Sequence, residues 1–87
     1  MSAAIAEYRI SLRLDPDDVD AQCRVADIEM SLGNAEEAFD RLLGVIRRTS
    51  GEDRNKVRLH LVGLFEIFPS RDPRVTKARS TLSSLLF

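Results

Sequence analysis

The sequence has little of the chemistry that most active sites need. Its 87 residues include one cysteine, one histidine and no tryptophan, and only 6% of them are aromatic. A single cysteine excludes a disulfide within the chain and is typical of a reducing compartment, so we expect a cytoplasmic protein. One histidine cannot alone supply the ligands of a zinc site, and no nucleophile, base and orienting group can be assembled around it. We therefore expect no enzyme activity, no cofactor and no metal.

Long apolar runs, clustered glycines and a basic leader are missing as well. No run approaches the roughly 20 residues of a membrane helix, and no basic segment precedes an apolar stretch at the N-terminus. We therefore expect neither a membrane partner nor a secretory signal. The four glycines are dispersed, which excludes a glycine-rich phosphate loop. The aspartates within 15–20 lack the glycine and glutamate of a calcium loop, and we interpret them as helix caps.

A strong net charge is also lacking, because acidic and basic residues nearly balance at −1. The balance hides an asymmetry, since residues 1–40 sum to −7 and residues 41–87 to +6. These charges can be ordinary solvated helix faces, or they can form a dipolar module whose basic end meets an acidic protein or a second copy. The sequence pI of about 5.8 and the lack of aromatics beside the basic residues argue against nucleic acid. Among the basic residues, the protein-binding candidates are Arg47, Arg48, Arg54 and Lys77.

What the sequence does contain is a helical repeat of 34 residues. Four positions recur with that displacement: Ala4, Tyr8, Ser11 and Pro16 correspond to Ala38, Leu42, Val45 and Ser50. A period of 34 is typical of tetratricopeptide repeats, in which hairpins of two helices stack on their neighbours. We predict an all-α fold, a right-handed stack of tetratricopeptide-like helical hairpins with about five helices and no strand.

Apolar spacing places these helices at about 2–14, 16–32, 35–48, 52–67 and 73–86. We interpret the chain, 1–87, as a single domain made of an orphan second helix at 1–14, a full repeat at 16–48 and a degenerate C-terminal capping hairpin at 52–86. The third helix is expected to pack Ala35, Ala38, Phe39, Leu42, Leu43, Val45 and Ile46. The fourth is apolar nearly all round, which predicts burial on two sides.

Helix ends are marked by aspartate, proline, glycine and asparagine. Pro16 can begin a helix and Asp15 is its predicted N-cap, a device that Asp-Pro at 72–73 repeats. Gly33 is expected to end the second helix in a left-handed conformation. Asn34, with a glutamate three residues on, predicts a capping box at the start of the third.

Two side chains retain reactive chemistry. Cys23 is adjacent to Arg24, but neighbours in a helix point to different faces, so the arginine does not activate the thiol. We interpret Cys23 as a small apolar filler on a packed helix, with a mixed disulfide to a partner as the alternative. His60 has no companion ligand, and we expect it to be partly buried and hydrogen-bonded to a neighbour.

Both ends of the chain carry apolar side chains that the repeat leaves unassigned. Leu86 and Phe87 fall off the core-facing stripe of the last helix. They either fold back onto the preceding helix or form an exposed anchor for a partner. The first helix leaves one side open, and we expect self-association of the isolated fragment through that edge. The residues on this open side are Ala6, Ile10 and Leu14.

The C-terminal half carries motifs more specific than the repeat. They are Glu-Ala-Phe-Asp-Arg-Leu-Leu at 37–43, Gly-Glu-Asp at 51–53, Leu-Phe-Glu-Ile-Phe at 64–68, Asp-Pro at 72–73 and Leu-Ser-Ser-Leu-Leu-Phe at 82–87. With these motifs, the chain from residue 17 onward resembles the C-terminal end of bacterial YbbN-type proteins. These are thioredoxin-fold proteins with a helical repeat tail, also called chaperedoxins.

The resemblance implies that a thioredoxin-like domain precedes this chain in cis. It also implies a redox-linked holdase role, a protein partner that is a client or the large cage chaperonin, and docking through the last helix. No Cys-x-x-Cys occurs in the sequence, so redox activity cannot reside in these 87 residues. The alternative is a generic tetratricopeptide scaffold fragment of an unrelated regulatory or assembly protein.

Overall fold

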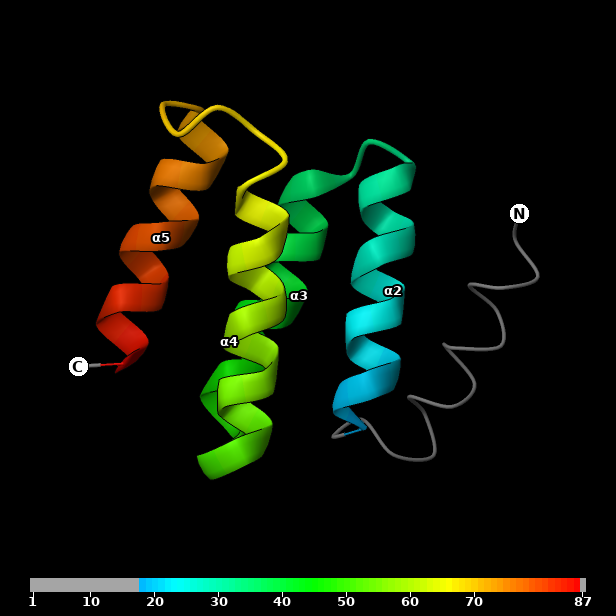
Figure 1. The fold of residues 1–87 in the computed structure, drawn as a ribbon, viewed down its shortest axis with the longest axis vertical. Coiled ribbons are helices and arrows are strands. Elements are labelled where there is room, and N and C mark those ends of the chain that lie inside the picture. The colour runs from blue at the N-terminus through cyan, green and yellow to red at the C-terminus, as the bar shows by residue number, and fades with distance from the viewer. Residues whose placement is uncertain (1–17, 87) are drawn as a thin grey trace.

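The computed structural model describes residues 18–86, which form helices joined by short connections (Figure 1). The helices are α2 (Val19–Ser31), α3 (Ala35–Arg48), α4 (Gly51–Phe65) and α5 (Pro73–Leu86). No strand occurs within this range, and the predicted all-α class is confirmed. The helix expected at 2–14 lies outside the described residues. None of the four helices is long and apolar enough to cross a membrane.

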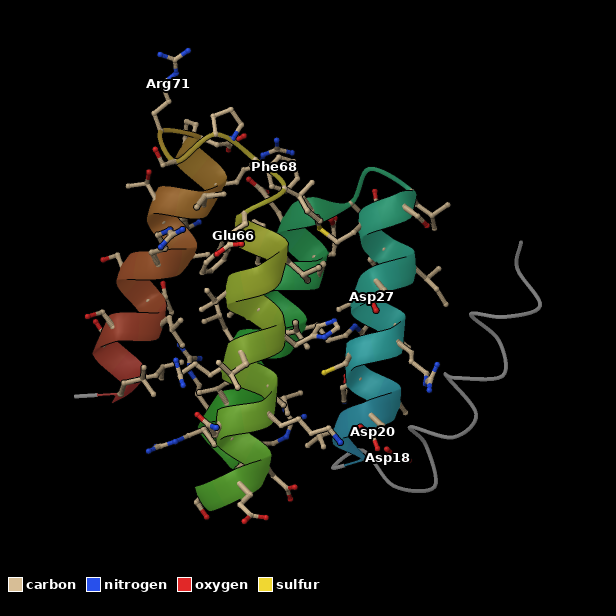
Figure 2. All side chains as sticks on the ribbon, viewed as in Figure 1. Asp18, Asp20, Asp27, Glu66, Phe68 and Arg71 are labelled. Atoms are coloured by element: carbon tan, nitrogen blue, oxygen red, sulfur yellow. The ribbon has the colours of Figure 1, made fainter. Side chains whose placement is uncertain are left out.

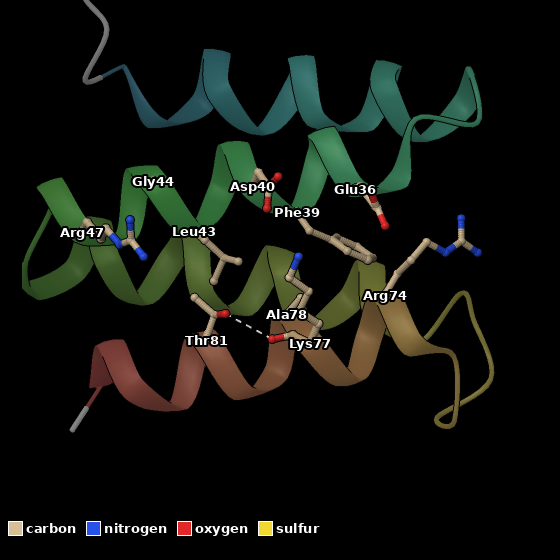
Figure 3. A pocket seen from close by; sticks show the side chains of 10 residues that line it. All are labelled: Glu36, Phe39, Asp40, Leu43, Gly44, Arg47, Arg74, Lys77, Ala78 and Thr81. Carbon is tan, nitrogen blue, oxygen red and sulfur yellow. Dashed lines mark hydrogen bonds between the residues drawn. The ribbon is translucent and has the colours of Figure 1, made fainter.

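Helix α3 is the element on which the others pack. It contacts α2, α4 and α5, and α2 also contacts α4. In Figure 1, α4 lies in front of α3, with α2 and α5 on either side. In Figure 3, residue numbers on α3 and α5 rise in the same direction, so these two helices run parallel. The hairpins α2–α3 and α4–α5 therefore stack with equivalent helices as neighbours, as the 34-residue repeat predicts.

The core is centred on α3. Its predicted apolar set is buried in full: Ala35, Ala38, Phe39, Leu42, Leu43, Val45 and Ile46. Phe39 meets Phe65 of α4 edge-on, with ring centroids 5.0 Å apart, and meets Phe68 in the same way at 6.0 Å. Edge-to-face pairs of this kind stabilise by about 0.5–1.5 kcal/mol beyond their burial. They join α3 to the hairpin that follows it.

The start of α2 differs from the prediction. The helix begins at Val19, three residues later than expected, and its N-cap is Asp18. The Asp18 Oδ1 accepts a hydrogen bond from the Ala21 N–H at 3.1 Å. The prediction of Asp15 as the cap is therefore wrong. Several aspartates precede this helix, and the one that caps it has an extended backbone that aims its carboxylate at the first turn.

Two helix ends were predicted at the connection between α2 and α3. The predicted C-terminal end of α2 is confirmed, and the predicted capping box at the start of α3 is wrong. Gly33 has a φ of +82°, so the left-handed glycine is confirmed. Asn34 is the N-cap of α3 but its side chain makes no capping hydrogen bond, so the predicted capping box is wrong. Its φ of −99° and ψ of 57° lie outside the extended region typical of a capping residue. Its N–H donates instead to the Glu29 carbonyl at 2.8 Å.

Helix α4 is less enclosed than its apolar sequence predicts. Leu59 is 56% exposed, and Ile67, just beyond the helix, is 65% exposed. The expected burial on two sides is therefore wrong. Neighbouring helices cover one side of α4, and no described element covers its outer side. The residues that α4 does bury are Val57, Leu61, Leu64 and Phe65.

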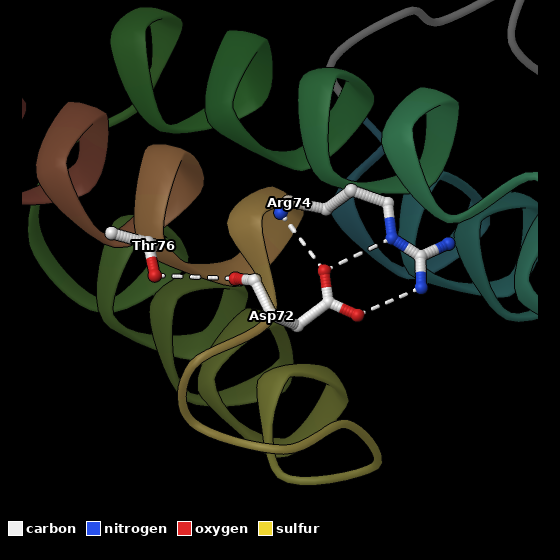
Figure 4. Close-up of polar contacts among 3 residues, drawn as sticks. All are labelled: Asp72, Arg74 and Thr76. Atoms are coloured by element: carbon white, nitrogen blue, oxygen red, sulfur yellow. Dashed lines mark hydrogen bonds and ion pairs between the residues drawn. The ribbon is translucent and has the colours of Figure 1, made fainter.

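Helix α5 begins at an aspartate–proline pair, as predicted. The Asp72 Oδ1 accepts the Arg74 backbone N–H at 2.9 Å (Figure 4). Its carboxylate also accepts the Arg74 side chain, from Nε at 3.1 Å and from Nη2 at 2.9 Å. These hydrogen bonds hold the pKa of the Asp72 carboxyl below its usual value. These contacts, all between residues two positions apart, fix the local geometry of the start of α5.

Candidate functional site

A groove of about 280 Å³ lies between α3 and α5 (Figure 3). Its floor consists of three buried apolar side chains, Phe39 and Leu43 from α3 and Ala78 from α5. The rest of its lining is charged, polar or small: Glu36, Asp40, Gly44, Arg47, Arg74, Lys77 and Thr81. An apolar floor with a polar border is the composition of a protein-docking surface.

Helical spacing places the charges on the two walls of the groove. On α3, Glu36, Asp40 and Arg47 are separated by four and seven residues and share one face. On α5, Arg74 and Lys77 are three residues apart. The acidic residues of α3 lie toward its N-terminus and the basic residue toward its C-terminus, an order that the helix macrodipole favours. The α3 wall of the groove therefore runs from acidic to basic, and Arg74 of α5 lies at the same end as Glu36 (Figure 3).

Not all of these charges are available to a partner. Arg74 is held by Asp72, and its guanidinium also lies over the Phe68 ring, 4.6 Å from the centroid. Among the residues that the structure describes, the other four charged side chains of the groove form no ion pair: Glu36, Asp40, Arg47 and Lys77. All four are exposed. They are the charges with which a partner could interact, and Glu36 also interacts electrostatically with Arg74 across the groove.

The groove brings together Arg47 and Lys77, two of the predicted protein-binding residues. Arg48 is exposed at the end of α3 and Arg54 is half-buried in the first turn of α4, and neither lines the groove. Leu86 is half-buried and packs against the core. Its role in binding stays a prediction. The candidates outside the described residues are Phe87, Ala6, Ile10 and Leu14.

The groove itself was not predicted from the sequence. Phe39 and Leu43 were expected only as core, and Glu36 and Asp40 were not singled out. They become the border and floor of a site because α5 lies parallel to α3. The signal was present in the repeat, since equivalent helices of successive hairpins are neighbours in such stacks.

The surroundings of the basic residues of α5 differ from the prediction. We expected no aromatic near them, but Arg74 lies over Phe68 and the Arg79 guanidinium lies 5.2 Å from the centroid of the Phe65 ring. Tertiary packing brings together residues that are distant in the sequence. Phe65 is buried, and both rings pack against Phe39. They serve the core of this chain and are not a platform for stacked bases.

A second cluster of charged side chains joins α2 to α4, with Asp20 and Asp27 on α2 (Figure 2). The His60 Nε2 lies 2.7 Å from the Asp27 Oδ1, which confirms the predicted hydrogen-bonded histidine. Lys56 pairs with Asp20, and this contact lowers the pKa of Asp20 and raises the pKa of Lys56. Both pairs are satisfied within the chain. We interpret this face as a junction between the two helices.

Cys23 lies beside these pairs and is buried. Burial raises the pKa of its thiol to about 11, and the carboxylates of Asp27 and Asp20 add to the effect. A thiol with this pKa is almost wholly protonated near neutral pH and is a poor nucleophile. The burial expected of a packed filler is confirmed, and the absence of a mixed disulfide stays a prediction. In the described part of the chain, no group of three potential metal-binding side chains occurs.

An apolar hollow of about 490 Å³ opens where the ends of α2 and α4 meet the loop that follows α4. Met30, Leu64 and Phe68 contribute to its lining. The two charged side chains that also line it, Asp27 and Arg74, already have partners within the chain. The hollow can take an apolar side chain but does not select a charge. The groove between α3 and α5 is therefore the stronger candidate site.

Comparison with known proteins gives one family and a set of close relatives. A family model described as tetratricopeptide repeat matches residues 1–87. Uncharacterized proteins of Mycobacterium bovis and of two strains of Mycobacterium tuberculosis are each 42% identical to the chain over 71 residues. The match covers 82% of this chain and 23% of each relative. The chain thus spans less than a quarter of the length of these curated relatives.

Proposed function

The chain belongs to the tetratricopeptide repeat family, and on this basis we propose that it is a protein-interaction module. The groove between α3 and α5 is the observation that best supports this function. It combines an apolar floor with four exposed charges that form no ion pair with a described residue. The proposed mechanism is surface recognition, in which no bond is made or broken.

We further propose that the module is the C-terminal domain of a cytoplasmic thioredoxin-like protein with a chaperone or co-chaperone role. The motifs shared with YbbN-type proteins support this assignment. The length of the relatives is compatible with it, because about three quarters of each lies outside the match and could hold a thioredoxin-like domain. The partner is then an unfolded client or the large cage chaperonin. The buried, protonated Cys23 supports binding without a redox step in this domain.

Aggregation of an unfolded protein tests the chaperone role. Citrate synthase diluted from guanidinium chloride scatters light as it aggregates. We expect the 87-residue chain to slow this rise in proportion to its concentration, whereas an equal mass of an unrelated helical protein should not. Unchanged scattering at a large molar excess would count against the chaperone role. That result would favour the scaffold alternative, in which the module binds one folded partner.

We also propose that the isolated chain self-associates through Ala6, Ile10 and Leu14. Repeat stacks need polar faces at their ends, and an apolar helix face left open is a surface for a second copy. Light scattering at high protein concentration should then give a mass above the 9.8 kDa of one chain. Ile10→Glu should restore the single-chain mass. A single-chain mass for the unsubstituted protein at every concentration would rule the edge out.

A further inference from the structure

We propose that the groove between α3 and α5 binds an amphipathic helix of a partner protein, with an acidic residue at its end beside Arg47 and a basic residue at its end beside Glu36. The inference rests on the proposed function, because it names the partner chemistry of the interaction module. Three features of the groove carry it: its shape, the order of its charges and a glycine in one wall.

The shape of the groove suits the side chains of a helix. Its volume of about 280 Å³ is below the roughly 300–1,000 Å³ of small-molecule pockets, so it suits a few side chains better than a whole small molecule. Phe39 and Leu43 are one turn apart on α3 and Ala78 lies across from them on α5, so the floor follows two parallel helix axes. A partner helix presents apolar side chains in such a stripe. Asp40 and Lys77 border the middle with opposite signs, so no net charge opposes these side chains.

The order of the charges sets the polarity of the partner. Glu36 and Arg47 are 11 residues apart, which corresponds to about 16 Å along α3, or three helical turns. Helices with an acidic first turn and a basic last turn are the kind that the macrodipole favours. Such a helix matches the groove when it runs antiparallel to α3 and α5. Its N-terminal carboxylate then lies beside Arg47, and its C-terminal ammonium lies beside Glu36.

Gly44 forms part of the α3 wall between the charged residues, although the packing of the chain does not require a glycine there. A Cβ at this position would meet only the Arg48 guanidinium, at 3.6 Å, an ordinary contact. Its φ is not positive, unlike that of Gly33 or Gly51. Glycine inside a helix is destabilising relative to alanine. Because glycine has no side chain, the backbone of α3 is open at this position and a partner helix can approach it closely.

Peptide binding tests the charge order directly. Three fluorescein-labelled, alanine-rich peptides of about 14 residues share one leucine stripe and differ only at their ends. The mixed peptide has glutamate in the first turn and lysine in the last, and the other two have lysine or glutamate at both ends. Fluorescence anisotropy should show saturable binding of the mixed peptide to the 87-residue chain, and about fivefold weaker binding of the other two. Equal binding of all three, or no saturable binding of the mixed peptide, overturns the proposal.

Charge reversal in the groove adds a test that a folding defect cannot mimic. Arg47→Glu should weaken binding of the mixed peptide about fivefold and strengthen binding of the lysine-ended peptide. Arg71→Glu is the matched control, because it makes the same charge change at an exposed residue in the loop before α5. It should change neither affinity. If the two reversals have the same effect, the charges of the groove do not contact the peptide.

Two alanine substitutions separate an effect on peptide binding in the groove from an effect on helix stability. Gly44→Ala and Gly63→Ala both replace glycine inside a helix, and a Cβ at Gly63 would meet nothing within 4 Å. Both should raise the Tm. Only Gly44→Ala should weaken binding of the mixed peptide, by about threefold or more, because its methyl group stands in the groove. Equal effects on binding overturn the proposal.

The aggregation assay is independent of the peptide assay. Peptide binding without chaperone activity would support the groove and contradict only the chaperone role.

Discussion

Arg41 on α3 and Glu29 on α2 are joined by two hydrogen bonds between the guanidinium and the carboxylate. Nε lies 2.7 Å from Oε1 and Nη2 lies 3.4 Å from Oε2, while the Arg41 Nη1 donates to the Gln22 Oε1 at 3.1 Å. The two charged side chains are only 28% and 15% exposed. The contact ties together the two helices of the hairpin that supplies one wall of the groove.

Removing the Glu29 carboxylate should therefore lower the stability of the fold. We expect Glu29→Ala to lower the free energy of unfolding by about 1–3 kcal/mol, because Arg41 is left largely buried with its main acceptor gone. Glu29→Gln keeps the volume and one acceptor and should cost less. Urea unfolding followed by circular dichroism measures both. Glu37→Ala, at an exposed position of α3, is the control, and an equal cost at both positions would contradict the assigned role.

The two N-caps of the first hairpin should respond differently to alanine. Asp18→Ala removes the acceptor of the Ala21 N–H and should cost about 1 kcal/mol of stability. Asn34 makes no capping hydrogen bond, so Asn34→Ala should cost only a few tenths of a kcal/mol. Thermal unfolding of the two variants under identical conditions makes the comparison. A larger loss at Asn34 than at Asp18 would restore the capping box that the sequence predicts.

The two caps also show how far the sequence could predict this fold. Helix α3 was predicted in full because its apolar residues fall on one clean stripe, which a single period defines. The start of α2 was not, because Asp15 and Asp18 are chemically equal as caps and only the backbone conformation selects one. Local pattern determines that a helix exists, whereas competition between equivalent residues decides where it begins.

Features that depend on which helices are neighbours were harder to predict. The sequence of α4 is apolar on several faces, but periodicity does not say which face has a partner, so the exposure of Leu59 was missed. The groove has the same origin. Arg47 and Lys77 were singled out one by one as exposed cations, and only the parallel packing of α3 and α5 gives them a common site with Glu36 and Asp40.

The contact between Asp72 and Arg74 predicts a pH dependence of stability. Side-chain hydrogen bonds from Arg74, followed by its backbone hydrogen bond, lower the pKa of Asp72 from its usual value of 3.8. A depressed folded-state pKa contributes stability that is present above the unfolded pKa and is lost as the pH falls through the folded pKa. We expect Asp72→Asn to lower the Tm at pH 7, and the difference from the parent chain to shrink below pH 3.8. A difference that stays constant down to pH 2 would show that the charge does not contribute.

Reaction of Cys23 with a disulfide reagent distinguishes a packed filler from a redox contact. The pKa of its thiol rises from 9.0 to about 11, so the thiolate fraction at pH 8 falls about a hundredfold, and burial also limits access. We expect the native chain to react at least about a hundredfold more slowly than the same chain in urea, where the thiol regains its ordinary pKa. Nearly equal rates would reopen the mixed disulfide with a partner. A slow native reaction would mean that the chain does not form a disulfide with a thioredoxin-like domain, because it contains no other thiol. Contact with such a domain would then be noncovalent.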